Sequence, residues 1–370
     1  MTLPSSGRTK TTSGGFLKMG MRAFACVQFL SKSPIAKARA SSRLCTEVRP
    51  RLLAVASRSV LVAAAGVVLA LSASGQGIDY AKIEILTEKI APNLYILSGS
   101  AGADPGHEDA AGGRIGILAG PDGIFMVDAQ YAQITDKVVA AIRKISAEPI
   151  RFLVNTHVHG DHTAGDANFV KMGALLFARE ELREEMLRPA AGNAGAARDA
   201  ARLPVVTYGM GDPVKLRLNG EVVDLIPVRA AHTGGDTMIR FENADVIMIG
   251  DFYRNYGYPF IDTNNGGTLK GALEALDLTM KLAGPNTRLI PGHGTIINRT
   301  DIVPYRDMIL GVQTKVQQMI SQGKSEQEVL AAKVTAPYDA KVPGGLLPAG
   351  AGTSADRFVS MVYSQLKGGK

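Results

Sequence analysis

The chain has 370 residues, of which 46% are hydrophobic and 20% are charged, with a formal net charge of +7, two cysteines and no tryptophan. This apolar content excludes a wholly disordered chain and suffices for one large domain or two smaller ones. A net positive charge ordinarily suggests a nucleic acid or an anionic membrane as partner, so its position along the chain decides what it means.

The positive charge is concentrated at the N-terminus. Residues 1–58 contain eleven basic residues and one acidic residue, a net charge of +10, which leaves the remaining 312 residues at −3. Both cysteines, Cys26 and Cys45, lie in this basic stretch, and all six histidines follow it. We therefore expect the rest of the chain to bind no nucleic acid, because such binding depends on clustered Lys and Arg.

Residues 59–75 have the composition of a secretory signal peptide. An uncharged apolar run of about fifteen residues follows Arg58 and ends in small residues, which is short for a bilayer span. We predict export to the periplasm or the medium, cleavage near residue 75 and no stable membrane insertion afterwards. An uncleaved N-terminal anchor, a buried helix and a transit peptide are the alternatives. Because Met19 and Met21 offer other starts, residues 1–58 are interpreted as a basic presequence, either an extended signal n-region or a mis-assigned start.

The remaining chain alternates short apolar runs with helical patterns. Strands are predicted at 94–97, 115–118, 124–127, 152–154, 175–178, 223–228, 238–241, 246–249 and 289–290, and helices at 134–145, 269–282, 304–321, 326–333 and 355–366. This interspersion predicts one α/β domain over residues 84–300 with a helical extension, 301–370, packed on it. Residues 99–113 and 190–203 are rich in small and polar residues and predict mobile loops or a short lid helix.

Four potential metal ligands lie within six residues directly after the predicted strand 152–154. His157 and His159 are two apart and point to the same side as the strand ends, and Asp161 and His162 lie in the turn that follows. Imidazole and carboxylate donors without cysteine suit zinc, and four of them can serve two cations at once.

Three further candidates also follow apolar strands: His232 in AHTGGD, Asp251 in IGD and His293 in PGHG. Loops at strand ends converge on one rim in α/β folds, so we expect all these side chains to meet there. The sixth histidine, His107, lies in a Gly-rich loop and is expected to be exposed to solvent.

HVHGDH, AHTGGD, IGD and PGHG, in this order and spacing, resemble the motifs of the metallo-β-lactamase fold superfamily over roughly residues 84–300. The resemblance implies a four-layer αβ/βα sandwich with a binuclear site between its two sheets. It also implies that His157, His159 and His232 bind one zinc ion. Asp161, His162 and His293 would bind the other, with Asp251 bridging both.

Such a site activates water at neutral pH. Two zinc ions lower the pKa of a bridging water from about 15.7 towards 7, and the resulting hydroxide attacks a polarised carbonyl or phosphoryl group. Asp161 is the predicted catalytic carboxylate, which accepts a hydrogen bond from the nucleophile and passes the proton to the leaving group. Asp128, at the end of strand 124–127, is interpreted either as an acceptor for a ligand imidazole or nearby backbone, or as a turn cap.

Asp251 occupies the position where cysteine-ligated zinc β-lactamases carry their cysteine. A bridging Asp is instead similar to hydroxyacylglutathione hydrolases, lactonases and phosphodiesterases of the superfamily. The aromatic segment after it predicts substrate contacts from Tyr253, Tyr256 and Tyr258, with Arg254 gripping a carboxylate or phosphate. The alternative is that these aromatics pack the segment onto the domain.

These observations predict an exported dizinc hydrolase of a small-molecule ester, thioester, lactone or β-lactam. The alternatives are a class B β-lactamase proper, an oxidoreductase with a single iron that resembles persulfide dioxygenases, and a metal-holding binding protein without turnover. Iron and manganese are the alternatives to zinc, since the same donors suit them.

Overall fold

The computed structural model describes residues 77–188 and 200–368. The predicted presequence, the signal peptide and most of the predicted loop 190–203 lie outside these residues. Among the described helices, none is long and apolar enough to cross a membrane.

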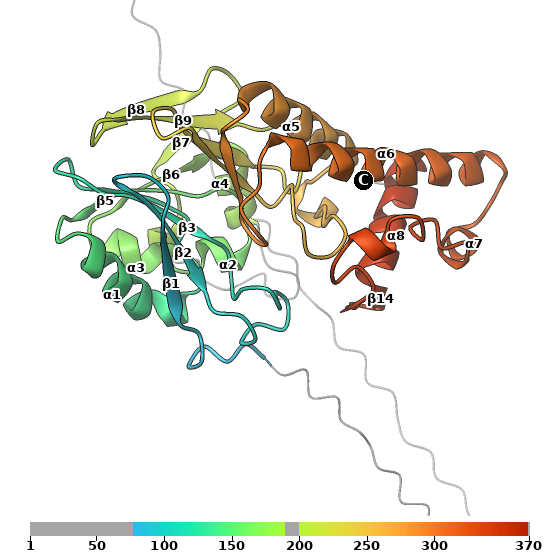
Figure 1. Ribbon diagram of the computed structural model, residues 1–370, viewed down its shortest axis with the longest axis horizontal. Helices are drawn as coiled ribbons and strands as arrows, with labels where there is room; N and C mark the ends of the chain where they lie inside the picture. Colours follow the sequence, from blue (N-terminus) through green and yellow to red (C-terminus); the bar gives the residue numbers. More distant parts are fainter. Residues whose placement is uncertain (1–76, 189–199, 369–370) are drawn as a thin grey trace, which may run out of the picture. The chain divides into compact units, whose positions relative to one another are not determined.

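Two mixed β-sheets form the centre of the fold (Figure 1). The first has seven strands in sequence order: β1 (Ile85–Lys89), β2 (Leu94–Gly99), β3 (Ile115–Leu118), β4 (Ile124–Val127), β5 (Ile150–Val154), β6 (Leu175–Arg179) and β7 (Val206–Tyr208). The second has the order β12-β11-β10-β9-β8, with β8 (Val214–Leu218), β9 (Glu221–Pro227), β10 (Thr237–Phe241), β11 (Val246–Gly250) and β12 (Arg288–Pro291).

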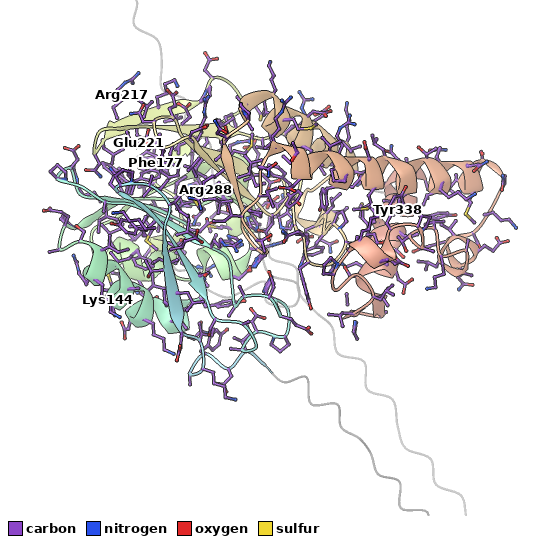
Figure 2. All side chains as sticks on the ribbon, viewed as in Figure 1. Lys144, Phe177, Arg217, Glu221, Arg288 and Tyr338 are labelled. Atoms are coloured by element: carbon purple, nitrogen blue, oxygen red, sulfur yellow. The ribbon has the colours of Figure 1, made fainter. Side chains whose placement is uncertain are left out.

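The inner faces of the two sheets pack against each other. Because successive side chains on a strand point to opposite faces, alternate residues of β4 divide between two clusters. Phe125 and Val127 join an inter-sheet core with Ile239 and Met248 of the second sheet, whereas Met126 packs on the outer side. Figure 2 shows Phe177 within the described body and the exposed Lys144 and Arg217 at its periphery.

Helices cover both outer faces. The first sheet packs against α1 (Thr135–Ile145) and α3 (Asp166–Lys171), with Ile142 and Phe169 fully buried there. The second sheet packs against α5 (Leu269–Leu282) and the C-terminal helices α6 (Arg299–Ser321), α7 (Glu326–Ala331) and α8 (Ser354–Leu366). The order helix, sheet, sheet, helix is the four-layer αβ/βα architecture that the family resemblance implied.

The C-terminal helices share the core of the second sheet. Ile309 of α6 and Phe358 of α8 are fully buried in one cluster with Ile247 and Leu276. Tyr258 stacks on Phe358 with ring centroids 5.9 Å apart. The extension after residue 300 therefore packs directly onto the domain and onto the segment that follows Asp251.

Several short elements were not predicted from the sequence. They include the strands β1, β7, β8, β13 (Pro348–Ala349) and β14 (Gly352–Thr353), and the helices α2 (Gly160–Thr163), α3 and α4 (Glu180–Leu187). β1 and β8 are edge strands; the side chains of β1 are largely exposed and β8 alternates exposed with partly or fully buried residues, so both lack the apolar runs from which strands were predicted. α2 is only four residues long and carries Asp161 and His162.

Candidate metal centre

Strand ends deliver the candidate ligands to one place. β4 and β5 are parallel neighbours in the first sheet, and β11 and β12 are parallel neighbours in the second. The carboxyl ends of parallel strands meet at the same edge, so the residues after these strands converge. Asp128 and His157 follow the first pair, and Asp251 and His293 follow the second.

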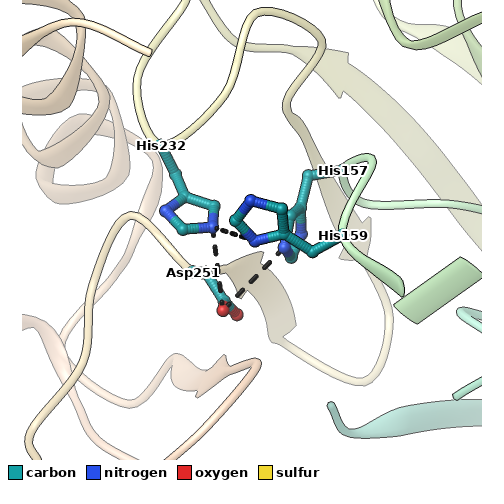
Figure 3. Close-up of side chains that lie close together, drawn as sticks. All are labelled: His157, His159, His232 and Asp251. Carbon is teal, nitrogen blue, oxygen red and sulfur yellow. Dashed lines mark hydrogen bonds and ion pairs between the residues drawn. The ribbon is translucent and has the colours of Figure 1, made fainter. Parts of the chain in front are cut away.

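One cluster consists of three imidazoles and a carboxylate (Figure 3). His232 Nε2 lies 3.0 Å from His159 Nδ1. Asp251 Oδ2 lies 3.8 Å from both His157 Nε2 and His232 Nε2. Burial lowers the pKa of His157 well below its usual value and, together with the charge of His159, lowers that of His232 to about 3. Neutral imidazole is the form that binds a metal ion.

The second cluster combines His162 and His293 with Asp161 and Asp251. His293 Nε2 lies 3.0 Å from Asp161 Oδ2 and 3.3 Å from Asp251 Oδ2, and His162 Nε2 lies 3.5 Å from Asp251 Oδ1. Burial disfavours the charged imidazoles, yet the nearby carboxylates raise the pKa of His162 to about 10 and that of His293 to about 9. The carboxylates therefore create a field that favours positive charge at this point.

The donor geometry fits two metal ions. Atoms 3–4 Å apart can share one ion at about 2.1 Å from each, which is the usual zinc–nitrogen or zinc–oxygen distance. His157 Nε2, Asp161 Oδ2 and Asp251 Oδ1 are buried and have no hydrogen-bond partner among the described residues. Such atoms are costly to bury unless something binds them. Asp251 belongs to both clusters, so one carboxylate reaches both positions.

Asp128 orients two of the imidazoles from behind. Its Oδ2 accepts hydrogen bonds of 2.7 Å from His162 Nδ1 and from Thr156 Oγ1, and its Oδ1 accepts one from Thr156 N. Because the Thr156 hydroxyl donates its proton to Asp128, Thr156 Oγ1 accepts a hydrogen bond from His157 Nδ1, 3.0 Å away. Both rings consequently direct Nε2 into the site, the nitrogen through which the neutral ring can bind a metal ion. The structure thus places Asp128 behind the His162 ring and the Thr156 backbone, the contacts that the first of its two considered roles requires.

Two further acceptors were missed by the sequence reasoning. His159 Nε2 donates to Asp262 Oδ2 over 2.8 Å, and His232 Nδ1 donates to the carbonyl oxygen of Phe260 over 2.6 Å. Both acceptors belong to the segment 252–267, which the sequence marked only by its aromatic residues. The outer nitrogens of His157, His159, His162 and His232 thus all have acceptors that fix the ring orientation.

The family model of the metallo-beta-lactamase superfamily matches residues 111–293. This range contains every residue of the two clusters described above. The chain belongs to the metallo-β-lactamase superfamily. Among curated proteins, no sequence matches this chain significantly.

Solved structures share the superfamily fold. A metallo-β-lactamase from Pontibacter korlensis has 16% identity and a TM-score of 0.51, and the match covers 61% of this chain and 99% of that one. The stereoselective inverting sec-alkylsulfatase Pisa1 from Pseudomonas sp. has 16% identity and a TM-score of 0.57, over 76% of this chain and 50% of that one. At these identities the likeness concerns the fold.

Asp262→Asn is expected to weaken metal binding by roughly 10–100-fold, because loss of an acceptor behind a ligand imidazole typically costs this much. The variant leaves His159 without the charged acceptor that now holds its Nε2. Competition with a chromogenic chelator measures the metal affinity. Asp212→Asn, a change at an exposed position, is the matched control. An Asp262→Asn affinity equal to that of the control would contradict this role.

A second buried carboxylate shapes the loop that carries His232. Asp236 accepts hydrogen bonds from His232 N at 2.7 Å and from Thr233 N and Oγ1 at 3.0 and 2.6 Å. Burial raises the pKa of Asp236 to about 6 despite these bonds. Its place in the AHTGGD motif, four residues after the histidine, is the sequence signal that could have revealed it.

The prediction that His107 is exposed to solvent is wrong. Its side chain is 20% exposed and its ring stacks on that of His293, with centroids 3.8 Å apart. Nδ1 donates to Asp104 Oδ2 over 3.0 Å, and Nε2 lies 3.4 Å from Asp161 Oδ2. Asp104 in turn accepts from the Tyr131 hydroxyl. These partners turn the Gly-rich loop inward over the second cluster, a contact between distant segments that local composition does not encode.

His107→Ala is expected to lower the affinity for the second metal ion about tenfold, because Asp161 and His293 lose a neighbour that restricts their side chains. This is the lower end of the range for residues that contact metal ligands without binding the metal. The first ion should stay bound. Metal analysis after graded chelator treatment separates the two ions. Equal loss of both ions, or no change in either, would contradict a role confined to the second cluster.

The four residues expected to contact substrate divide into two groups. Tyr253, Arg254 and Tyr256 line a cavity of about 730 Å³ between the segments 253–257 and 294–297, α6 and residues 338–343. Tyr258 is fully buried and donates from its hydroxyl to Asp339 Oδ1 over 2.6 Å. Its prediction as a substrate residue is wrong, because the C-terminal helices cover it.

Proposed function

We propose that this chain is an exported dizinc hydrolase that cleaves a small ester, thioester, lactone or β-lactam. The superfamily and the His/Asp clusters support a metal-dependent hydrolase. The observation that carries the proposal is Asp251, one carboxylate that lies within metal-binding distance of two sets of imidazoles: His157, His159 and His232 in one set, and His162 and His293 in the other. Two joined clusters fit two ions acting on one water better than a single redox metal.

The first ion would be held by His157, His159 and His232, and the second by Asp161, His162 and His293, with Asp251 contributing to both. When bound, two zinc ions supply a water of lowered pKa and polarise the scissile carbonyl. Imidazole and carboxylate donors without sulfur favour zinc, with iron and manganese as alternatives. The hydrogen bonds behind the rings hold these donors in place before substrate arrives.

Asp161 is the candidate for proton transfer. Its Oδ2 lies in the second cluster without a hydrogen bond from the described residues, and its side chain is 12% exposed. An oxygen in this position can accept a proton from the attacking water and release it to the leaving group. His107 and His293, on either side, restrict the rotation of the carboxylate.

The substrate pocket supports a small organic substrate. The cavity of about 730 Å³ has the size of a small-molecule site, and its lining begins two residues after Asp251 and one after His293. Tyr256 offers aromatic surface there and Arg254 offers a positive charge, whereas Tyr253 is buried in the cavity wall with 5% of its surface exposed. Residues 59–75 support export, and the net charge of −3 after residue 58 favours a small molecule over a nucleic acid.

A hydrolysis screen tests the proposal. The purified enzyme, with its metal content measured on the same sample, is assayed against thioesters, lactones, phosphodiesters, a chromogenic cephalosporin and a secondary alkyl sulfate. We expect about two zinc ions per chain and turnover of a carboxylic ester, thioester, lactone or lactam. One iron per chain together with persulfide oxidation would instead establish the oxidoreductase alternative. No turnover of any compound by a fully metal-loaded protein would favour a binding protein.

A further inference from the structure

Two arginines that lie far apart in the sequence line one small cavity beside the metal centre. Arg254 belongs to the segment after Asp251, and Arg357 belongs to α8 in the C-terminal extension. Both line a cavity of about 70 Å³, together with Tyr256, Ser354 and the loop 105–108.

Neither guanidinium group has a carboxylate partner. Arg254 Nε donates to the carbonyl oxygen of Tyr256 over 2.7 Å, and Arg357 Nε is buried without a hydrogen-bond partner. Across residues 77–188 and 200–368, no Asp or Glu oxygen lies within 4.0 Å of either group. Burial, together with the charge of Arg254, lowers the pKa of Arg357 to about 10. Two neighbouring positive charges without a counter-charge attract an anion.

The cavity also contains one acidic group. Glu108 lines it, and Glu108 Oε2 accepts a hydrogen bond from the Tyr256 hydroxyl over 2.9 Å. Two guanidinium groups and one carboxylate still leave an excess of positive charge. The carboxylate is engaged by an uncharged donor, so both arginines keep their bonding capacity for a ligand.

Side-chain contacts connect this cavity with both halves of the metal centre. The Arg357 guanidinium lies 4.4 Å above the Phe260 ring, which stacks on His159 with centroids 5.7 Å apart. On the other side, the loop 105–108 lines the cavity while its His107 contacts Asp161. The Arg357 guanidinium is thus connected to the ligand candidate His159 through a single intervening side chain, Phe260.

We propose that Arg254 and Arg357 bind an oxyanionic group of the substrate while its scissile bond lies at the metal centre. This inference rests on the proposed hydrolase function and narrows the substrate to compounds that carry a carboxylate, sulfate or phosphate away from the reacting carbonyl. Arginine binds such groups with two parallel N–H donors, and the stack on Phe260 holds the Arg357 plane in one orientation. Arg357 is therefore a specificity-determining residue contributed by the C-terminal extension.

Matched ester pairs test the proposal. Kinetics are measured on 4-nitrophenyl butyrate and on its carboxylate analogue, the 4-nitrophenyl monoester of succinic acid, with a sulfated ester as a further arm. We expect a lower KM for the anionic esters. Arg357→Gln should raise that KM roughly 10–100-fold, the usual effect of losing hydrogen bonds to a charged group, and should raise the KM of the neutral ester much less. Preference between the carboxylate and sulfate arms identifies the group that is bound.

Two control variants separate binding from folding. Arg217→Gln removes an exposed charge from β8 and should change neither substrate, and Arg357→Lys, which keeps the charge, should retain part of the discrimination. Thermal unfolding checks that each variant folds. Equal KM values for neutral and anionic esters in the wild type, or equal effects of Arg357→Gln on both, would overturn the proposal while leaving the hydrolase intact.

A binding measurement is independent of turnover. Crystals of the metal-loaded enzyme soaked in selenate should show an anomalous peak between the two guanidinium groups, in addition to any at the metal ions. The peak should disappear in Arg357→Gln. Selenate absent from the wild-type cavity would overturn the proposal even if every ester is hydrolysed. If selenate binds there but the enzyme cleaves no ester, the anion site is supported and the proposed hydrolase function is contradicted.

Discussion

Asp161→Ala is expected to lower kcat/KM by roughly 10²–10⁴-fold, the range for loss of a proton-transferring group, while the chain remains folded. The variant removes the carboxylate whose Oδ2 lies 3.0 Å from His293 Nε2, and with it a donor to the second metal ion. Steady-state kinetics on the best substrate from the screen, with metal analysis of the same sample, measure the effect.

Two comparisons show which function of Asp161 is lost. Asp161→Asn keeps the shape of the side chain and a metal-binding oxygen but can no longer accept a proton as a carboxylate does, so it should keep more metal than Asp161→Ala and remain slow. Asp307→Ala, at an exposed position on α6, is the control for a lost carboxylate. Near-normal turnover of Asp161→Ala would refute the proposed role.

The inner part of the site could be predicted because its residues directly follow buried strands. β4, β5, β11 and β12 are fully or largely apolar, and each is followed within three residues by a member of the site. A strand fixes the position of the residues that directly follow it. A short motif such as HVHGDH therefore predicts the location of its side chains even when the rest of the fold is unknown. The backbone conformation at one of these strand ends was visible only in the structure. Asp128 has a φ of 59°, a strained value of the kind found at functional positions.

The outer part could not be predicted, because it depends on how distant loops pack. Asp262 reaches His159 across 103 positions of the sequence, and His107 meets His293 only because the loop 99–113 turns inward. Neither segment has the periodicity that marks a strand or a helix. Composition alone gave the wrong environment for His107, since glycine and alanine around a histidine are compatible with exposure or with close packing.

In the aromatic segment after Asp251, the sequence likewise could not predict which side chains are exposed and which are buried. Tyr256 and Tyr258 are two apart, yet one lines both cavities and the other is fully buried beneath Phe358. The difference is made by α8, which begins 96 residues after Tyr258 and whose Ser354 Oγ accepts from Tyr258 N. The C-terminal extension thereby decides which side chains of this segment substrate can reach.

Asp251→Asn is expected to remove more of the metal centre than any other single change. The carboxylate is shared by the two clusters, with Oδ2 3.8 Å from His157 Nε2 in the first and Oδ1 3.5 Å from His162 Nε2 in the second. An amide has the same shape but no charge and only one oxygen, so it cannot reach both positions as a ligand. Metal content should fall from two ions to at most one per chain, and kcat/KM by at least roughly 10²-fold.

Chelator treatment then separates loss of metal from damage to the fold. A metal ion that binds only the folded chain stabilises it by RT ln(1 + [metal]/Kd), so stripping the wild type should lower its midpoint of thermal unfolding. The same treatment should change Asp251→Asn much less, because that variant has less metal to lose. Adding zinc should restore both stability and activity to the wild type alone. Asp251→Asn would contradict this prediction by keeping two ions and by losing as much thermal stability on chelator treatment as the wild type. That result would show that the two clusters do not share this carboxylate, and it would favour the alternative of an enzyme with a single metal ion.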